Sequence, residues 1–122
     1  MREYLKFYID GQWVDPLALR TLDVENPATE QACGKIALGS AADVDKAVKA
    51  ARKAFASWSQ SSRAQRLDLL QNIAAEYQKR AADMAAAVTQ EMGAPAALAR
   101  NSHVPLGIGH LSVAIDVLKT FA

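Results

Sequence analysis

The spacing of apolar residues changes once along this chain, near Gly39, and this change limits the possible folds more than any other feature. Before Gly39, apolar and polar residues alternate in short runs, which is the pattern of half-buried β-strands. After Ser40, apolar residues recur every three or four positions, which is the pattern of amphipathic α-helices. The sequence therefore predicts an α/β protein in which short strands come first and helices follow.

The first part of the chain predicts strands over about residues 6–38. Asp10 and Gly11 lie between alternating residues and favour a two-residue hairpin, because a type I′ turn requires positive φ at both of its central positions. A second strand is predicted over residues 21–25, where the turn at Asn26-Pro27 ends it. A weaker strand follows over residues 31–38.

Two helices are predicted over residues 41–57 and 63–92. Each begins after a serine that has a capping partner three positions later, Asp43 after Ser40 and Gln65 after Ser62. Gly93 supplies a C-terminal cap for the second helix, and Pro95 lies just beyond it. The apolar positions of this second helix are Leu67, Leu70, Ala74, Tyr77, Ala81, Met84 and Val88.

A last helix is predicted over about residues 96–121, with a break near 102–105 because Pro105 would clash with the carbonyl of Asn101. The chain thus holds three helices, or four if the break divides the last one. A helix of about 30 residues is about 45 Å long, whereas a compact globule of this size is roughly 35 Å across. Because the apolar stripe also continues to Phe121, we expect this chain to be a fragment of a larger protein.

Composition and charge exclude several classes of partner. The 14 basic and 13 acidic side chains give a net charge of +1, which provides no electrostatic footprint for a nucleic acid or an anionic membrane. No run approaches the ~18–20 apolar residues of a membrane span. Cys33 is the only cysteine, so the chain can form no internal disulfide, and a reducing, cytoplasmic location is expected.

Three groups of residues could carry chemistry, and each has a simpler structural interpretation. Cys33 lies in a predicted strand rather than in the cationic or helix N-terminal setting that activates a thiol. Gly107-Ile108-Gly109 resembles a dinucleotide fingerprint, but it follows a helical pattern rather than a strand, so we expect these glycines to allow close helix packing. His103 and His110 are seven residues apart, which makes a poor pair of metal ligands.

The order of several segments resembles the start of NAD(P)-dependent aldehyde dehydrogenases. These segments are residues 7–14, 24–29 (with Asn26-Pro27-Ala28-Thr29) and 43–55. Trp58, Ser62-Arg63 and Arg66-Leu67 fall where that family begins its long second helix. The stretch from Glu91 to Pro95 is similar to the acidic-x-Gly-x-Pro junction that follows this helix.

The resemblance implies that residues 1–122 form the incomplete N-terminal part of a Rossmann-like cofactor-binding domain. This part would act as a scaffold that packs against the nucleotide-binding sheet and helps to line the substrate entrance. The whole enzyme would oxidise an aldehyde to a carboxylic acid with NAD or NADP, using a nucleophilic cysteine, an oxyanion-stabilising asparagine and a general-base glutamate. In this family all three lie farther along the chain than Ala122, so we predict no catalytic or cofactor-binding residue here, and a chain that is inactive alone.

The resemblance also implies partners and one minor site. The partners are the remainder of the chain's own polypeptide, identical subunits in a homo-oligomer, and a small aldehyde. Some family members bind a structural cation through backbone carbonyls at positions that correspond to Val24 and Glu91 here. Carbonyl oxygens suit a hard cation.

Two other interpretations stay open. One is a free-standing, non-enzymatic helical module that dimerises through the apolar stripes of its helices. The other is an inactive relic that still assembles with full-length subunits.

Overall fold

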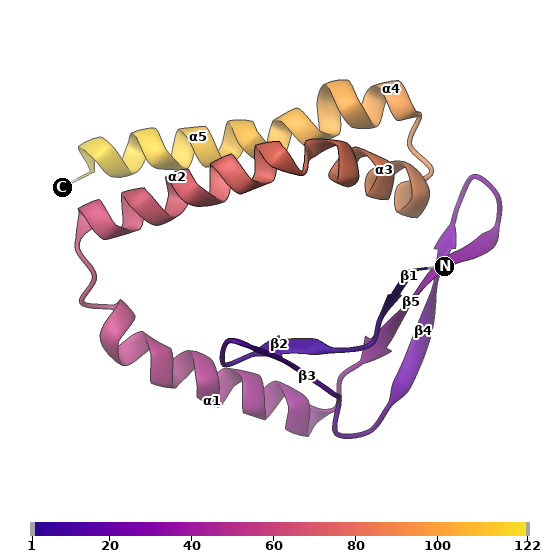
Figure 1. Cartoon of the computed structure of the whole chain (residues 1–122), viewed down its shortest axis with the longest axis horizontal. Coiled ribbons are helices and arrows are strands. Elements are labelled where there is room, and N and C mark those ends of the chain that lie inside the picture. Colours follow the sequence, from indigo (N-terminus) through magenta and orange to yellow (C-terminus); the bar gives the residue numbers. More distant parts are fainter. Residues whose placement is uncertain (1, 122) are drawn as a thin grey trace. The chain divides into compact units, whose positions relative to one another are not determined.

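The computed structural model describes residues 2–121, in which five strands precede the helices (Figure 1). The chain divides into two compact units, Met1–Gln60 and Ser61–Ala122. The first unit holds the strands and one helix, and the second is helical. The α/β class and the order of strands before helices agree with the prediction.

A three-stranded sheet in the first unit has the order β1-β5-β4, formed by Arg2–Tyr4, Gln31–Leu38 and Arg20–Asn26. β4 and β5 pair antiparallel with a register shift between Val24 and Glu25, whereas β1 pairs parallel with β5. The sequence prediction began the strands at about residue 6 and therefore missed β1. A three-residue strand has no periodicity of its own, and its pairing depends on β5, about thirty residues later in the chain.

The hairpin of β2 (Phe7–Ile9) and β3 (Gln12–Val14) confirms the predicted turn. Asp10 has φ 53° and Gly11 has φ 78°, as a type I′ turn requires. Across the hairpin, the rings of Tyr8 and Trp13 meet edge to face with their centroids 5.3 Å apart.

Helix α1 (Ala41–Trp58) begins at the predicted Ser40 cap and extends one residue beyond the predicted end. It contacts β2. Its apolar stripe nevertheless remains largely uncovered within this chain. The exposed fractions are 58% for Val44, 53% for Val48, 59% for Phe55 and 46% for Trp58.

The predicted helix over residues 63–92 is divided in the structure into α2 (Arg63–Lys79) and α3 (Ala81–Met92). Arg80 joins them with φ −106° and ψ 13°, and its N–H reaches the carbonyl of Tyr77, three residues back. The apolar spacing is the same on both sides of Arg80, so the sequence carries no signal for the break. The two helices have 17 and 12 residues, so neither is about 45 Å long. Helix length therefore does not support the expectation that this chain is a fragment.

Gly93 ends α3 with φ 67°, as its predicted role as a cap requires. α4 (Ala96–Leu98), the π-helical segment η1 (Ala99–His103) and α5 (Val104–Thr120) then follow. The predicted break near 102–105 is this π-helical segment instead. The N–H of Val104 bonds to the carbonyl of Ala99, five residues back, and the wider turn brings Pro105 into the first turn of α5, where its missing N–H is tolerated.

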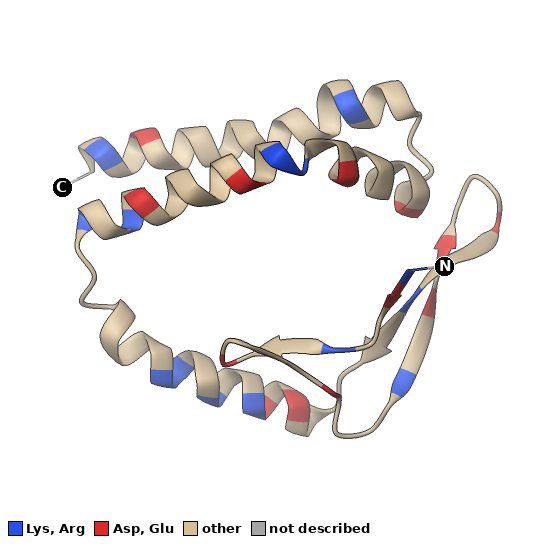
Figure 2. Cartoon of the chain, viewed as in Figure 1, with Lys and Arg blue, Asp and Glu red and all other residues tan. Residues whose placement is uncertain are grey.

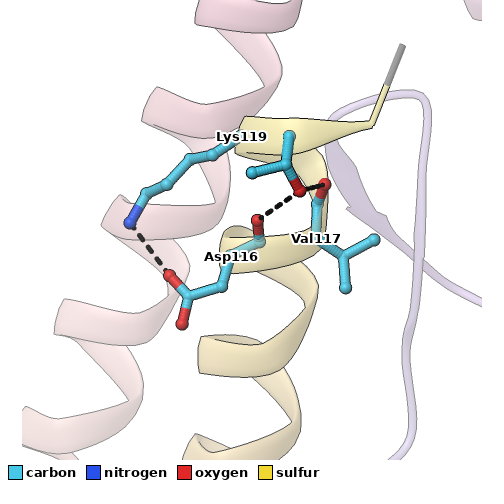
Figure 3. A network of polar contacts seen from close by, with 4 residues as sticks. Asp116, Val117 and Lys119 are labelled. Atoms are coloured by element: carbon cyan, nitrogen blue, oxygen red, sulfur yellow. Dashed lines mark hydrogen bonds and ion pairs between the residues drawn. The ribbon is translucent and has the colours of Figure 1, made fainter.

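The core of the second unit is small and built around Ala85, Ala94, Ala99 and Val104, with Tyr77, Ala81 and Val88 packed against it. α2 lies along α5, and the guanidinium of Arg63 donates to the carbonyl of Lys119 at 3.4 Å. At the end of α5, the hydroxyl of Thr120 donates to the carbonyls of Asp116 and Val117, and Lys119 pairs with Asp116 at 2.9 Å (Figure 3). Among residues 2–121, no helix is both long and apolar enough to span a membrane.

Candidate functional site

Val24, one of the two predicted cation-binding positions, lies in β4 at the register shift of the sheet. Its carbonyl oxygen accepts a hydrogen bond from the Sγ of Cys33 at 3.3 Å.

Glu91, the other predicted position, lies in the last turn of α3, just before the Gly93 cap. The last carbonyls of a helix have no partner within the helix, so the Glu91 carbonyl is of the type that a cation could use. Val24 belongs to the first unit and Glu91 to the second. In the described part of the chain, no group of three or more His, Cys, Asp or Glu side chains is arranged to hold a metal ion.

Cys33 lies in β5, half-buried, and its thiol donates to the Val24 carbonyl of the adjacent strand. A thiol is activated at a helix N-terminus or beside a cation. Cys33 lies inside a strand, where the backbone supplies no helix dipole. The structural interpretation of Cys33 therefore fits its position.

Gly107 and Gly109 both lie within α5, not in a turn between a strand and a helix. This position agrees with the rejection of a dinucleotide fingerprint. A Cβ atom on Gly107 would overlap the Tyr77 hydroxyl and lie 2.7 Å from Cζ of the same ring, whereas a Cβ on Gly109 would meet nothing within 4 Å. The expected close packing thus applies to Gly107 but not to Gly109.

His103 ends η1 and His110 lies exposed on α5. The Nδ1 atom of His103 is buried and has no hydrogen-bond partner among residues 2–121. The sequence carries no signal that one ring nitrogen of His103 would be buried.

Asp43 is the only charged side chain that is buried among the described residues, with 5% of its surface exposed. Its carboxylate accepts from the N–H and the hydroxyl of Ser40, at 2.8 and 2.7 Å, and from the N–H of Leu17 at 3.0 Å. The hydrogen bonds from Ser40, then that from Leu17, lower the pKa of Asp43. The capping box was predicted, but the bond to Leu17 was not, because it joins residues 26 positions apart.

These contacts hold segments of the first unit together. The thiol of Cys33 and the carboxylate of Asp43 both bond to backbone groups of neighbouring elements.

The comparisons with known proteins identify the family of the chain. The family model described as "Aldehyde dehydrogenase family" matches residues 13–122. A 3-succinoylsemialdehyde-pyridine dehydrogenase from a Pseudomonas species is 46% identical over 99% of this chain. The chain spans about a quarter (26%) of the length of that relative.

Solved structures place the same fold in larger enzymes. An aldehyde dehydrogenase from Bartonella henselae matches all of this chain and 26% of its own, with a TM-score of 0.98 and 43% identity. Aldehyde dehydrogenase C from Pseudomonas syringae, crystallised as a variant with NAD+ and octanal, matches 96% of this chain and 24% of its own, with a TM-score of 0.93 and 46% identity. This chain belongs to the aldehyde dehydrogenase family.

Proposed function

We propose that this chain is the N-terminal scaffold of a Rossmann-like cofactor-binding domain, in an enzyme that oxidises an aldehyde to a carboxylic acid with NAD or NADP. The observation that carries the proposal is the TM-score of 0.98 against the Bartonella henselae enzyme, because all of this chain superposes on only 26% of that protein. A segment that keeps its shape inside a protein almost four times longer is suited to a supporting role.

The exposed apolar side chains support this role. Val44, Val48, Phe55 and Trp58 line one stripe of α1, and each exposes 46% or more of its surface. A contiguous apolar surface on a soluble protein is usually a contact surface. The remainder of the enzyme's own polypeptide would provide that contact, and identical subunits would extend it in a cytoplasmic homo-oligomer.

The cofactor would be held mainly by residues outside this chain. In the described residues, the one glycine pair that resembles a dinucleotide fingerprint lies inside α5. The nicotinamide would accept a hydride in the complete enzyme, and this chain would contribute the position and rigidity of neighbouring elements rather than a reacting group.

A chimaera tests the scaffold role. The matching quarter of the Bartonella henselae enzyme is replaced by residues 1–122, and aldehyde-dependent formation of NADH is measured. We expect the chimaera to be active, and to remain active when Cys33→Ser is introduced, because the nucleophile lies elsewhere. A correctly folded but inactive chimaera, or loss of activity on Cys33→Ser with the fold intact, would contradict the proposal.

The backbone carbonyls of Val24 and Glu91 are proposed as ligands of a structural cation in the complete enzyme, together with groups outside this chain. The same chimaera allows a test, since its thermal midpoint can be measured in potassium, sodium and choline chloride at equal ionic strength. We expect a higher midpoint with potassium or sodium than with choline. Equal midpoints in all three salts would refute the site.

A further inference from the structure

Three lysines of α1 border one side of a groove in the first unit, called here the lysine groove. Lys46, Lys49 and Lys53 face residues of the β2–β3 hairpin, including Ile9, Asp10 and Gln12, around a cavity of about 430 Å³. Both walls belong to the same compact unit.

The spacing of the lysines places their charges in a row. Residues at steps of three and four share one face of a helix, and a rise of 1.5 Å per residue separates them along the axis by about 4.5 and 6 Å. Figure 2 shows the basic bands that recur along α1. The row would match a ligand with several closely spaced negative charges.

Few carboxylates compensate these charges. Asp10 is the acidic residue that lines the groove, and its Oδ2 lies 3.8 Å from the Nζ of Lys53. Asp43 acts on Lys46 electrostatically, but its oxygens already accept from Ser40 and Leu17. Within residues 2–121, no carboxylate forms an ion pair with Lys49.

The opposite side of the groove favours binding over simple solvation of the lysines. Ile9 lines that side and is 8% exposed, and the half-buried Ala50 lines the groove from α1, between the lysines. Charges of one sign in a cleft with low-dielectric walls concentrate their field there. The volume also falls in the range of roughly 300–1,000 Å³ that is usual for small-molecule sites.

We propose that the lysine groove binds an oligophosphate, either free or as the phosphate chain of a nucleoside triphosphate. Lysine binds phosphate as a point charge, and linked phosphates carry adjacent charges that the row of ammonium groups can follow. An extended acidic peptide is the competing ligand, and the last titrations below distinguish it from a phosphate chain. The proposal is independent of aldehyde oxidation.

Calorimetric titration of the chimaera that carries residues 1–122, with its cofactor site saturated with NAD+, against sodium tripolyphosphate at low salt tests the proposal. Neutralising one lysine contact of about 1 kcal/mol should weaken binding about fivefold, so we expect this loss for Lys49→Gln and a larger one for the double variant Lys46→Gln/Lys49→Gln. Lys119→Gln on α5 is the matched control and should leave the affinity unchanged. These side chains are exposed, and identical circular dichroism spectra would confirm that the variants keep the fold.

Asp10→Asn supplies a test of opposite sign. Asparagine is favoured in a type I′ turn, so the hairpin is kept while the competing carboxylate is lost, and binding should tighten at least twofold. Absence of tripolyphosphate binding, equal losses for Lys49→Gln and Lys119→Gln, or no tightening with Asp10→Asn would overturn the proposal.

Further titrations identify the source of the phosphate. ATP and tripolyphosphate should bind alike if the groove recognises only the phosphate chain, whereas tighter binding of ATP would assign the site to a nucleoside triphosphate. Inorganic phosphate should bind more than tenfold more weakly than either. Tighter binding of a hexaglutamate peptide than of tripolyphosphate would contradict the assignment to phosphate.

Discussion

At the scale of single residues, Gly107 and Gly109 form a natural pair for comparison. A Cβ on Gly107 would overlap the Tyr77 ring, whose hydroxyl donates to the carbonyl of Val104 at 3.0 Å. Gly107→Ala should therefore lower the free energy of unfolding by about 1–3 kcal/mol, the usual range for overpacking. Urea unfolding of the chimaera with the Bartonella henselae enzyme, followed by circular dichroism, measures the change.

Gly109→Ala is the control for this prediction, because a Cβ added at this position would meet nothing within 4 Å. Alanine is a better helix former than glycine by up to about 1 kcal/mol, so this variant should be neutral or more stable. A Gly107→Ala variant as stable as Gly109→Ala would show that Tyr77 does not restrict this position.

Asp43 gives a pH-dependent prediction at the same scale. Its hydrogen bonds lower its pKa below the ordinary value of 3.8, so the folded state prefers the ionised carboxylate. The associated stability is present above pH 3.8 and is lost as the pH falls through the folded-state pKa. Asp43→Asn should lower the urea midpoint at neutral pH and reduce its further decrease below about pH 4.

Asp45→Asn is the matched control, since Asp45 is exposed on the same helix. It should change the urea midpoint little at any pH. Equal acid sensitivity of the wild type and of Asp43→Asn would contradict a role for the buried carboxylate in acid unfolding.

At the scale of elements, the helix caps are the features most directly tied to the sequence. The N–H of Ser62 donates to Oε1 of Gln65 at 2.8 Å, and the N–H of Gln65 donates to Oγ of Ser62 at 3.2 Å. Ser62→Ala removes the side-chain half of this box and should destabilise the second unit by about 1 kcal/mol. Ser62→Asp keeps an acceptor and should restore most of the loss in the same thermal unfolding experiment, whereas equal midpoints for both variants would argue against the cap.

Features that depend on neighbouring residues were predictable, and features that depend on distant ones were not. The Asp10-Gly11 turn and the Ser40 and Ser62 caps carry local signals, because the turn and the capping bonds join residues at most three apart. The pairing of β1 with β5 and the bond from Leu17 to Asp43 join distant residues. Short sequence patterns carry no information on such pairings.

The same limit applies to the candidate sites. A cation bound through the carbonyls of Val24 and Glu91 would be invisible to residue-type reasoning, since every residue has a carbonyl. The lysine groove could not be predicted, because its opposite wall comes from hairpin residues that lie more than thirty positions before the lysines in the chain. The break at Arg80 has no counterpart in the apolar spacing, which continues through it.

At the scale of the whole molecule, the amphipathic pattern of the sequence and the burial in the structure disagree in an informative way. The stripe of Val44, Val48, Phe55 and Trp58 predicts a buried helix face, and the structure leaves all four exposed. In the second unit, Leu106, Val113 and Val117 of α5 are also exposed. An apolar pattern that a chain does not bury internally indicates a surface that another polypeptide covers.

This disagreement leads to a prediction for the isolated chain. If the exposed stripes normally contact the remainder of an aldehyde dehydrogenase, residues 1–122 alone should bind a hydrophobic dye such as ANS and unfold over a broad urea range, because few large side chains anchor the fold. The chimaera with the Bartonella henselae enzyme should not bind the dye and should unfold cooperatively. A free-standing helical module predicts the opposite for the isolated chain, namely a monodisperse dimer in light scattering that excludes the dye and unfolds cooperatively. Dye binding and unfolding of the isolated chain therefore distinguish a segment of an aldehyde dehydrogenase from a free-standing helical module, and neither measurement requires a substrate.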